Sequence, residues 1–354
     1  METHATQTAH EVELPSQVGA GRDLTTRSFK IALAVVALLG FVYLGRHYFS
    51  ELSRISEARL AGLLAIALIH VFTLWLQGCT LRCGLQPFGN HITGKQGFAL
   101  SVMGSYANLL LPRSGIAATA AFLKQQCQTK LIDFSSIVLY NGGLFVLSSS
   151  LLACGVVAWD WSVSGVRPEF WLLCGLPALA LISAAGVLIK WQVPAGYQGW
   201  GSAGLHKLCH ASQQLSHSKN FWSLVGLNLL MTVSRAARLY AAFWALAVDV
   251  HPLGVLLASA LGDLAFVFAV TPAALGFREA AITFSAGAMA TTSSLALSVA
   301  LFDRLVFSAT VVILAQFIVT WVVSQRRRHG RPAANPASNF LISGSTRATR
   351  PRRT

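Results

Sequence analysis

The chain has 354 residues, of which 54% are hydrophobic and only 11% are charged, whereas an ordinary soluble domain carries about 25% charged residues. Its mean hydropathy of +0.57 excludes a disordered chain and argues against a soluble enzyme. Lys and Arg outnumber Asp and Glu by 27 to 13, a formal net charge of +14. Eight Arg and no acid lie in residues 325–354, so the excess charge belongs largely to a tail and does not indicate nucleic-acid binding. The composition is that of a membrane protein.

The residues before the first apolar run lack the pattern of a signal peptide. Residues 1–27 carry four acids and two Arg and contain no apolar stretch, which predicts a disordered cytosolic leader. An integral membrane domain is expected at residues 28–324. Residues 325–354 are expected to form a basic, disordered cytosolic tail.

Long uncharged runs follow one another through this domain, and a helix needs about 20 apolar residues to cross the hydrocarbon core. They lie at 31–45, 60–81, 134–159, 170–189, 280–302 and 305–324. Two further apolar regions, 220–248 and 252–277, are interrupted by Arg235, Arg238 and Asp263. Backbone groups in hydrocarbon must be hydrogen-bonded within the protein. We therefore predict an all-α, polytopic helical bundle with six to eight spans.

The basic residues outside the apolar runs predict the orientation. Residues 190–219 contain three Lys and no acid, and the charged residues of the C-terminal tail are all Arg. Residues 160–169, in contrast, contain two acids and one Arg. Lys and Arg stay preferentially on the cytoplasmic side. We therefore predict a multi-pass protein of the bacterial cytoplasmic (inner) membrane with both termini inside.

Two segments, residues 108–115 and 271–279, each combine Pro, Gly and Arg before a new helix. Pro removes a helix hydrogen bond, and Gly permits the turn before the chain re-enters a helix. We expect a broken or re-entrant helix at each, although a simple kink or loop between ordinary helices is the alternative. The residues that would set the broken geometry are Pro112, Gly115, Pro272 and Gly276.

The two segments lie about 160 residues apart, one in each half of the domain. Interrupted helices at corresponding places in two halves point to a transporter-like site built on inverted repeats. If residues 96–130 dip in from the cytoplasm and residues 252–290 from outside, six full spans remain. That count keeps both termini inside, as the charges require.

Ionisable residues in the apolar segments are the strongest functional signal, because each costs at least about 2.5–3.5 kcal/mol to insert. These segments contain five Arg and three acids, so positive charge is in surplus. A negatively charged ligand would neutralise this surplus, and the planar guanidinium group of Arg is well suited to bind phosphate. Helices beginning after the two breaks would add the positive ends of their dipoles. The candidate binding residues are Asn108, Arg113, Arg235, Arg238, Arg278 and Arg304, with Asp263, Glu279 and Asp303 as orienting or coupling acids.

Two other interpretations of these charges remain open. The Arg side chains could snorkel to the membrane interfaces. The adjacent pairs Arg278-Glu279 and Asp303-Arg304 could instead bond across helices in a purely structural role. His70, amid apolar residues, is better explained by hydrogen-bonded packing than by proton relay.

Catalytic and metal-binding patterns are absent from the sequence. We find no Ser-His-Asp order, Walker loop, dinucleotide fingerprint or metalloprotease motif. Cys79 and Cys83 have no second ligand pair for zinc. We therefore expect no metal and no cofactor, and a non-enzymatic role is favoured.

At the two broken segments the sequence resembles the transmembrane region of lysylphosphatidylglycerol synthases, a family also called flippase-like. Pro272 through Glu279 resembles the family's Pro-x-x-x-Gly-x-x-Glu motif, Asn108 to Gly115 its first-half signature, and Arg304 an Arg common in its late helix. Where the family often has Glu and Arg after the first-half Gly, this chain has Ile116 and Thr119. The similarity covers residues 28–324. It does not extend to the aminoacyl-transfer domain of the synthases, so transfer of lysine to a lipid is not implied.

The resemblance implies a unit that moves or handles a lipid or lipid-linked sugar between leaflets. Together with the buried Arg residues, it predicts a translocase or transporter for a lipid with an anionic headgroup. One alternative is a non-catalytic scaffold that partners a glycosyltransferase or another lipid-modifying enzyme. Another is a membrane-embedded enzyme acting on a polyprenyl or phospholipid substrate. The expected partners are membrane lipids, and nucleic acid is not among them.

Overall fold

The computed structural model describes residues 58–111, 113–165, 170–188, 202–265 and 276–328. The predicted leader and most of the predicted tail lie outside these residues, as do the expected span at 31–45 and both motif prolines, Pro112 and Pro272. Within the described residues every regular element is helical. The predicted all-α helical membrane bundle is therefore confirmed.

The first half of the described domain consists of a long helix, two short helices and another long helix. These are α3 (Leu60–Leu85), followed by a 3₁₀ turn, α4 (Gly94–Leu110), α5 (Ser114–Cys127) and α6 (Leu131–Ser164). α4 starts where Thr93 and Gln96 cap each other: the Gln96 amide donates to Thr93 Oγ1, and the Thr93 amide donates to Gln96 Oε1. α6 ends at Gly165, whose φ of 68° is the left-handed conformation that Gly adopts readily.

The second half repeats this order. α7 (Phe170–Leu188) and α8 (Ser202–Ser216) come before the second half in the chain. The second half comprises α9 (Phe221–Ala245), α10 (Pro252–Ala265), α11 (Phe277–Phe284), the 3₁₀ helix η5 (Gly287–Met289) and α12 (Ser293–Arg328). α9, α10, α11 and α12 begin 161, 158, 163 and 162 residues after α3, α4, α5 and α6. The four elements of each half thus correspond in kind, order and spacing.

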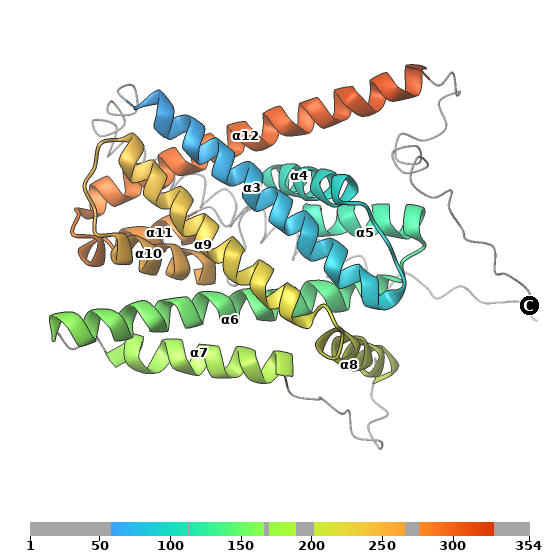
Figure 1. Ribbon diagram of the computed structural model, residues 1–354, viewed down its shortest axis with the longest axis horizontal. Coiled ribbons are helices and arrows are strands. Elements are labelled where there is room, and N and C mark those ends of the chain that lie inside the picture. Colours follow the sequence, from blue (N-terminus) through green and yellow to red (C-terminus); the bar gives the residue numbers. More distant parts are fainter. Residues whose placement is uncertain (1–57, 112, 166–169, 189–201, 266–275, 329–354) are drawn as a thin grey trace, which may run out of the picture.

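The two halves run in opposite directions along the long helices (Figure 1). The Arg59 amide, before α3, donates to the Ala245 carbonyl at the end of α9, at 2.9 Å. At the opposite end of this pair, Asn220, which precedes α9, donates to the Cys83 carbonyl of α3. α6 and α12 also run opposite to each other. This is the arrangement predicted as an inverted repeat.

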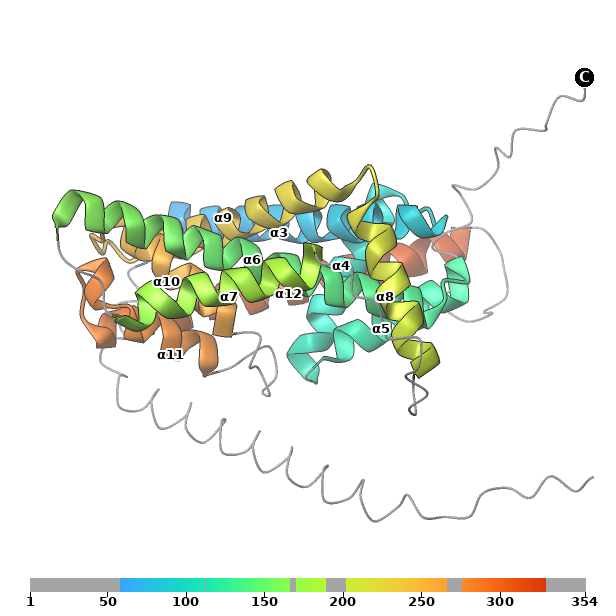
Figure 2. The ribbon, with the colours of Figure 1, turned by 90° about the horizontal axis from the view of Figure 1, so that it is seen from below.

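The first short helix of each half packs against a long helix of the other half. α4 lies against α12, and α10 lies against α6 (Figures 1 and 2). Where α3 and α9 cross, the buried hydroxyls of Thr73 and Ser234 are 2.8 Å apart. These two residues are 161 positions apart, the same separation as the starts of α3 and α9. They therefore mark the axis that relates the two halves.

Three helices of the described residues are long and apolar enough to cross a membrane: Leu60–Phe88, Leu131–Val163 and Ser293–Thr320. The expected spans at 60–81 and 134–159 are thus confirmed. The expected spans at 280–302 and 305–324 are wrong in their boundaries, because α11 ends at Phe284 and one helix begins again at Ser293. Ala290 is left-handed and the Leu295 amide donates to Thr292 Oγ1, so a turn and a helix cap interrupt a run whose composition is apolar.

Candidate functional site

Seven charged residues of the second half lie close together in the interior. α9 supplies Arg235 and Arg238, α10 supplies Asp263, α11 supplies Arg278 and Glu279, and α12 supplies Asp303 and Arg304. All except Arg235 are buried, and the Arg235 side chain is only 17% exposed. The snorkelling interpretation therefore does not apply to these Arg residues. We call this group the buried ion network.

Asp303 is the centre of the network. Its carboxylate accepts hydrogen bonds from Arg238 Nη2 at 3.1 Å and from Arg278 Nη1 at 2.9 Å, and Arg238 Nε lies 2.9 Å from Oδ1. One acid on α12 thus holds one guanidinium from α9 and another from α11. Removing an ionised group from water is costly unless it is paired, and the two Arg side chains supply that pairing.

His70 extends the network to α3. Arg238 Nη1 lies 3.1 Å from His70 Nδ1, and since a guanidinium can only donate, His70 accepts through Nδ1. The imidazole ring also contacts Phe307, with ring centroids 4.4 Å apart. The sequence-based prediction of hydrogen-bonded packing agrees with these contacts.

Glu279 links the second predicted break to α12. One carboxylate oxygen accepts from the backbone amide of Gly276 at 2.8 Å, and the other accepts from Arg304 Nη1 at 3.3 Å. Gly276 has a φ of 88°, a left-handed conformation in which a Cβ would be strained. Glu279 therefore caps the start of α11 and joins it to α12.

Arg235 and Asp263 form the remaining pair, with Arg235 Nη1 3.3 Å from Asp263 Oδ2. The Arg235 guanidinium also lies over the Phe145 ring, 4.7 Å from its centroid. Among the described residues, the network contains four Arg and three acids. It therefore carries a formal surplus of one positive charge when all the groups are ionised.

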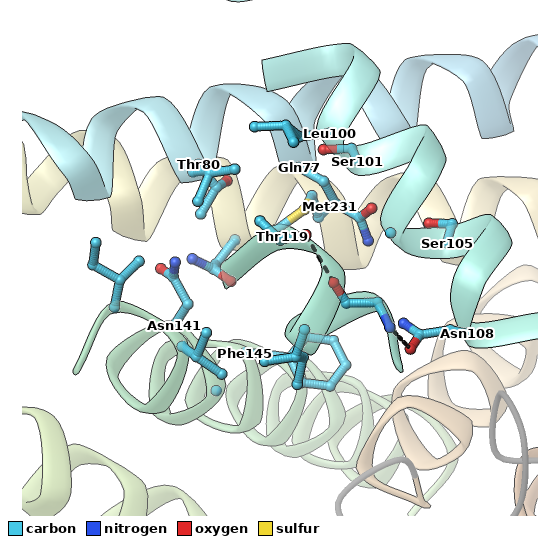
Figure 3. A pocket seen from close by; sticks show the side chains of 18 of the residues that line it. Gln77, Thr80, Leu100, Ser101, Ser105, Asn108, Thr119, Asn141, Phe145 and Met231 are labelled. Atoms are coloured by element: carbon cyan, nitrogen blue, oxygen red, sulfur yellow. Dashed lines mark hydrogen bonds between the residues drawn. The ribbon is translucent and has the colours of Figure 1, made fainter. Parts of the chain in front are cut away.

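A pocket of about 350 Å³, lined by both apolar and polar side chains, adjoins the network on the side of the first predicted break (Figure 3). It is lined by residues of α3, α4, α5, α6 and α9, including the whole contact between Asn108 and Gly115. Among the described residues that line it, Arg235 is the only one with a formal charge. Arg235 thus belongs both to the pocket and to the ion network.

The first break is shaped by a close contact between α4 and α5. Asn108 Oδ1 accepts from the Gly115 amide at 2.8 Å, and Thr119 Oγ1 donates to the Gly115 carbonyl at 2.8 Å (Figure 3). Any Cβ at position 115 would collide with the Gly104 carbonyl oxygen. Arg113, at φ 59° before α5, has an exposed side chain. It stands apart from the buried ion network that contains the other four candidate Arg residues.

Several pocket residues did not emerge from the sequence as candidates. The amides Gln77, Asn141 and Asn228 lie within long apolar helices and face the same pocket as Asn108. The available signal was the occurrence of an amide in an apolar segment, because such a group must find a partner when it is buried. Amides give no spacing pattern, so nothing in the sequence groups these three together.

A sequence model of one protein family, described as lysylphosphatidylglycerol synthase TM region, matches residues 29–315. The match includes both predicted breaks, the pocket and the buried ion network. No curated protein matches this chain.

Proposed function

Since the chain belongs to the family of the lysylphosphatidylglycerol synthase transmembrane region, a lipid-related family of membrane proteins, we propose that it translocates or transports a lipid or lipid-linked precursor with an anionic headgroup. The observation that carries the proposal is the position of Arg235. Its partly exposed guanidinium lies in the wall of a pocket of mixed polar and apolar lining and belongs to a network with a surplus positive charge.

In this proposal Arg235 binds the anionic group directly. One of its nitrogens faces Asp263, and a guanidinium has five N–H donors, so donors remain for a phosphate. Arg238, Arg278 and Arg304 are held by Asp303 and Glu279. They would keep the electrostatic potential beside the pocket positive. They would also join α9, α11 and α12, which would move together during transport.

The charges at the helix ends support the proposed orientation in the membrane. Lys124, Lys130 and Lys219 lie at the end of the bundle where α3 finishes, and α8 docks there through a bond from Gln214 to the Pro87 carbonyl. The positive-inside rule assigns this end to the cytoplasm. At 17 and 14 residues, α4 and α5 are shorter than a span of about 20 residues. We propose that they form a re-entrant hairpin from the cytoplasm, and that α10 and α11 form its inverted counterpart from outside.

The test uses the purified protein in vesicles that contain fluorescent phosphatidylglycerol. Transbilayer movement is followed by chemical quenching of the dye in the outer leaflet. Replacing Arg235→Gln removes the charge that would meet the phosphate, and a charge-assisted hydrogen bond is worth about 1.5–3 kcal/mol. We expect the rate to fall roughly ten-fold or more.

The matched control is Arg82→Gln, which removes the same charge from an exposed residue of α3 outside the pocket. It should leave the rate unchanged. Equal rates for wild type and Arg235→Gln would count against the site. A wild-type protein that moves no lipid but co-purifies with a stoichiometric lipid-modifying enzyme would replace transport with the scaffold role.

A further inference from the structure

We propose that Asp263 takes up a proton when the anionic headgroup binds, so that a proton gradient drives the movement of the lipid. This inference rests on the proposed transport function and adds its energy source. It follows from how the three acids of the buried ion network are paired.

Asp263 is the least compensated of these acids. Asp303 is held by two guanidinium groups, and Glu279 accepts hydrogen bonds through both of its carboxylate oxygens. Among the described residues, Asp263 Oδ2 has one partner, Arg235 Nη1 at 3.3 Å, and Asp263 Oδ1 is buried without a hydrogen-bond partner. A buried carboxylate needs such partners far more when it is ionised than when it is neutral. Of the three acids, Asp263 therefore loses least when it is protonated.

The charged groups that face Asp263 are positive. α10 packs against α6, α9, α11 and η5. Three Arg residues of the network act on Asp263 electrostatically, namely Arg235 and Arg238 of α9 and Arg278 of α11. α6 packs against α10 through apolar side chains and the Cys154 thiol, and its acids Asp133 and Asp160 lie near its two ends, whereas η5 contains no titratable residue. The three guanidinium groups favour the ionised carboxylate, so Asp263 is protonated more easily when another anion neutralises them.

A headgroup phosphate bound at Arg235 supplies that second negative charge. Arg235 lies in the pocket wall and pairs with Asp263, so it joins the anion to the acid. With four Arg and three acids ionised, the network has a surplus of one positive charge. A proton on Asp263 adds one positive charge, and a singly charged headgroup removes it again. The proton and the anion therefore favour each other's binding, and this coupling is reciprocal.

Buried hydroxyls offer the proton a route to Asp263. Ser259 lies one turn before Asp263 on the same face of α10, and its hydroxyl is buried without a hydrogen-bond partner. α6 packs against α10 and carries a similar hydroxyl at Ser149, one turn after Phe145, whose ring lies beneath the Arg235 guanidinium. A hydroxyl both donates and accepts, so it can pass a proton on. Both Ser residues lie toward the end of the bundle where α10 begins and α6 ends, which the proposed orientation places outside.

The experiment places the full-length protein in vesicles that contain a trace of fluorescent phosphatidylglycerol and have a lower pH outside than inside. Because one proton accompanies one negative charge, the equilibrium ratio of lipid between the inner and outer leaflets should rise about ten-fold for each pH unit. Chemical quenching of the dye in the outer leaflet measures this ratio. Nigericin, which collapses the pH gradient, should restore an even distribution, and protein-free vesicles give the background.

Variant Asp263→Asn imitates the protonated acid. It should move the lipid without responding to the gradient, because Arg235 still binds the anion and no proton is exchanged. Asp263→Ser also removes the carboxylate and serves if the first variant does not fold. The matched control Asp249→Asn removes the same charge from an exposed residue outside the pocket and should keep the wild-type response.

The outcomes separate this inference from the function on which it rests. If wild type moves no lipid at any pH, the proposed transport itself fails, and this inference fails with it. If wild type moves the lipid but the distribution ignores the gradient, transport stands and proton coupling is overturned. A wild-type gradient response in Asp263→Asn, or the loss of all transport in a folded Asp263→Asn protein, would overturn the assignment of the proton to Asp263.

Discussion

At the scale of single residues, Asp303 is the acid that forms ion pairs with two of the buried Arg side chains. It is fully buried between Arg238 and Arg278, which come from α9 and α11. Breaking a buried ion pair from one side leaves an uncompensated charge, which typically costs 3–5 kcal/mol, whereas replacing both partners costs much less. The network is therefore a structural joint between helices as well as a source of positive potential.

A double-mutant cycle tests this joint. We expect Asp303→Asn to destabilise the protein by about 3–5 kcal/mol, because two guanidinium groups lose their acid. Arg278→Gln should destabilise it less, because Arg238 still neutralises Asp303. The double variant Arg278→Gln/Asp303→Asn should be more stable than Asp303→Asn alone, as measured by thermal unfolding in detergent. Strictly additive effects of the two substitutions would show that the pair is not coupled.

At the scale of elements, the hairpin of α4 and α5 depends on a close backbone contact. Gly115 lies against the Gly104 carbonyl and is held by Asn108. Two turns earlier in α4, Gly97 packs against Gly78 of α3, where an added Cβ would lie only 2.6 Å from backbone atoms. Small residues at two places along α4 therefore allow this short helix to lie close to both α3 and α5.

We expect Gly115→Ala to force α4 and α5 apart and to destabilise the protein by roughly 1–3 kcal/mol, the usual range for overpacking. It should also weaken lipid transport, because Gly115 lines the pocket. The matched control is Gly226→Ala in α9, where an added Cβ meets nothing within 4 Å. Thermal unfolding and transport by the two variants are compared, and a Gly115→Ala protein as stable and active as the control would contradict the role of the contact.

At the scale of the whole molecule, the inverted repeat provides the same framework twice with different contents. The α3–α9 crossing at Thr73 and Ser234 joins two halves that run in opposite directions. A pocket lined mainly by the first half, with Arg235 of the second, adjoins the self-paired ion network of the second half. Under the proposed transport function, exchange of these two conditions between the halves would open the molecule to one side of the membrane and then to the other.

The orientation of this framework can be measured by cysteine labelling. Ser162, near the end of α6, and Lys219, before α9, are exposed and lie at opposite ends of the bundle. With the six native Cys replaced, a membrane-impermeant maleimide should label Ser162→Cys in intact cells. It should label Lys219→Cys only after permeabilisation, because the proposed orientation places the Lys-rich end in the cytoplasm. The reverse pattern would invert the proposed orientation and place the pocket in the outer half.

Composition, motifs and local patterns were enough to predict the helical membrane class, the family, the correspondence of two interrupted segments and the buried ionisable residues of the second half. The class follows from composition and the family from short motifs. The buried residues follow from the rarity of ionisable groups in apolar runs. Only the tertiary structure decided that Asp303 holds Arg238 and Arg278, that Arg113 stands apart, and that Gln77 and Asn141 face a pocket beside Arg235. Which side chains meet depends on how helices distant in the chain pack together, and no local pattern encodes that packing.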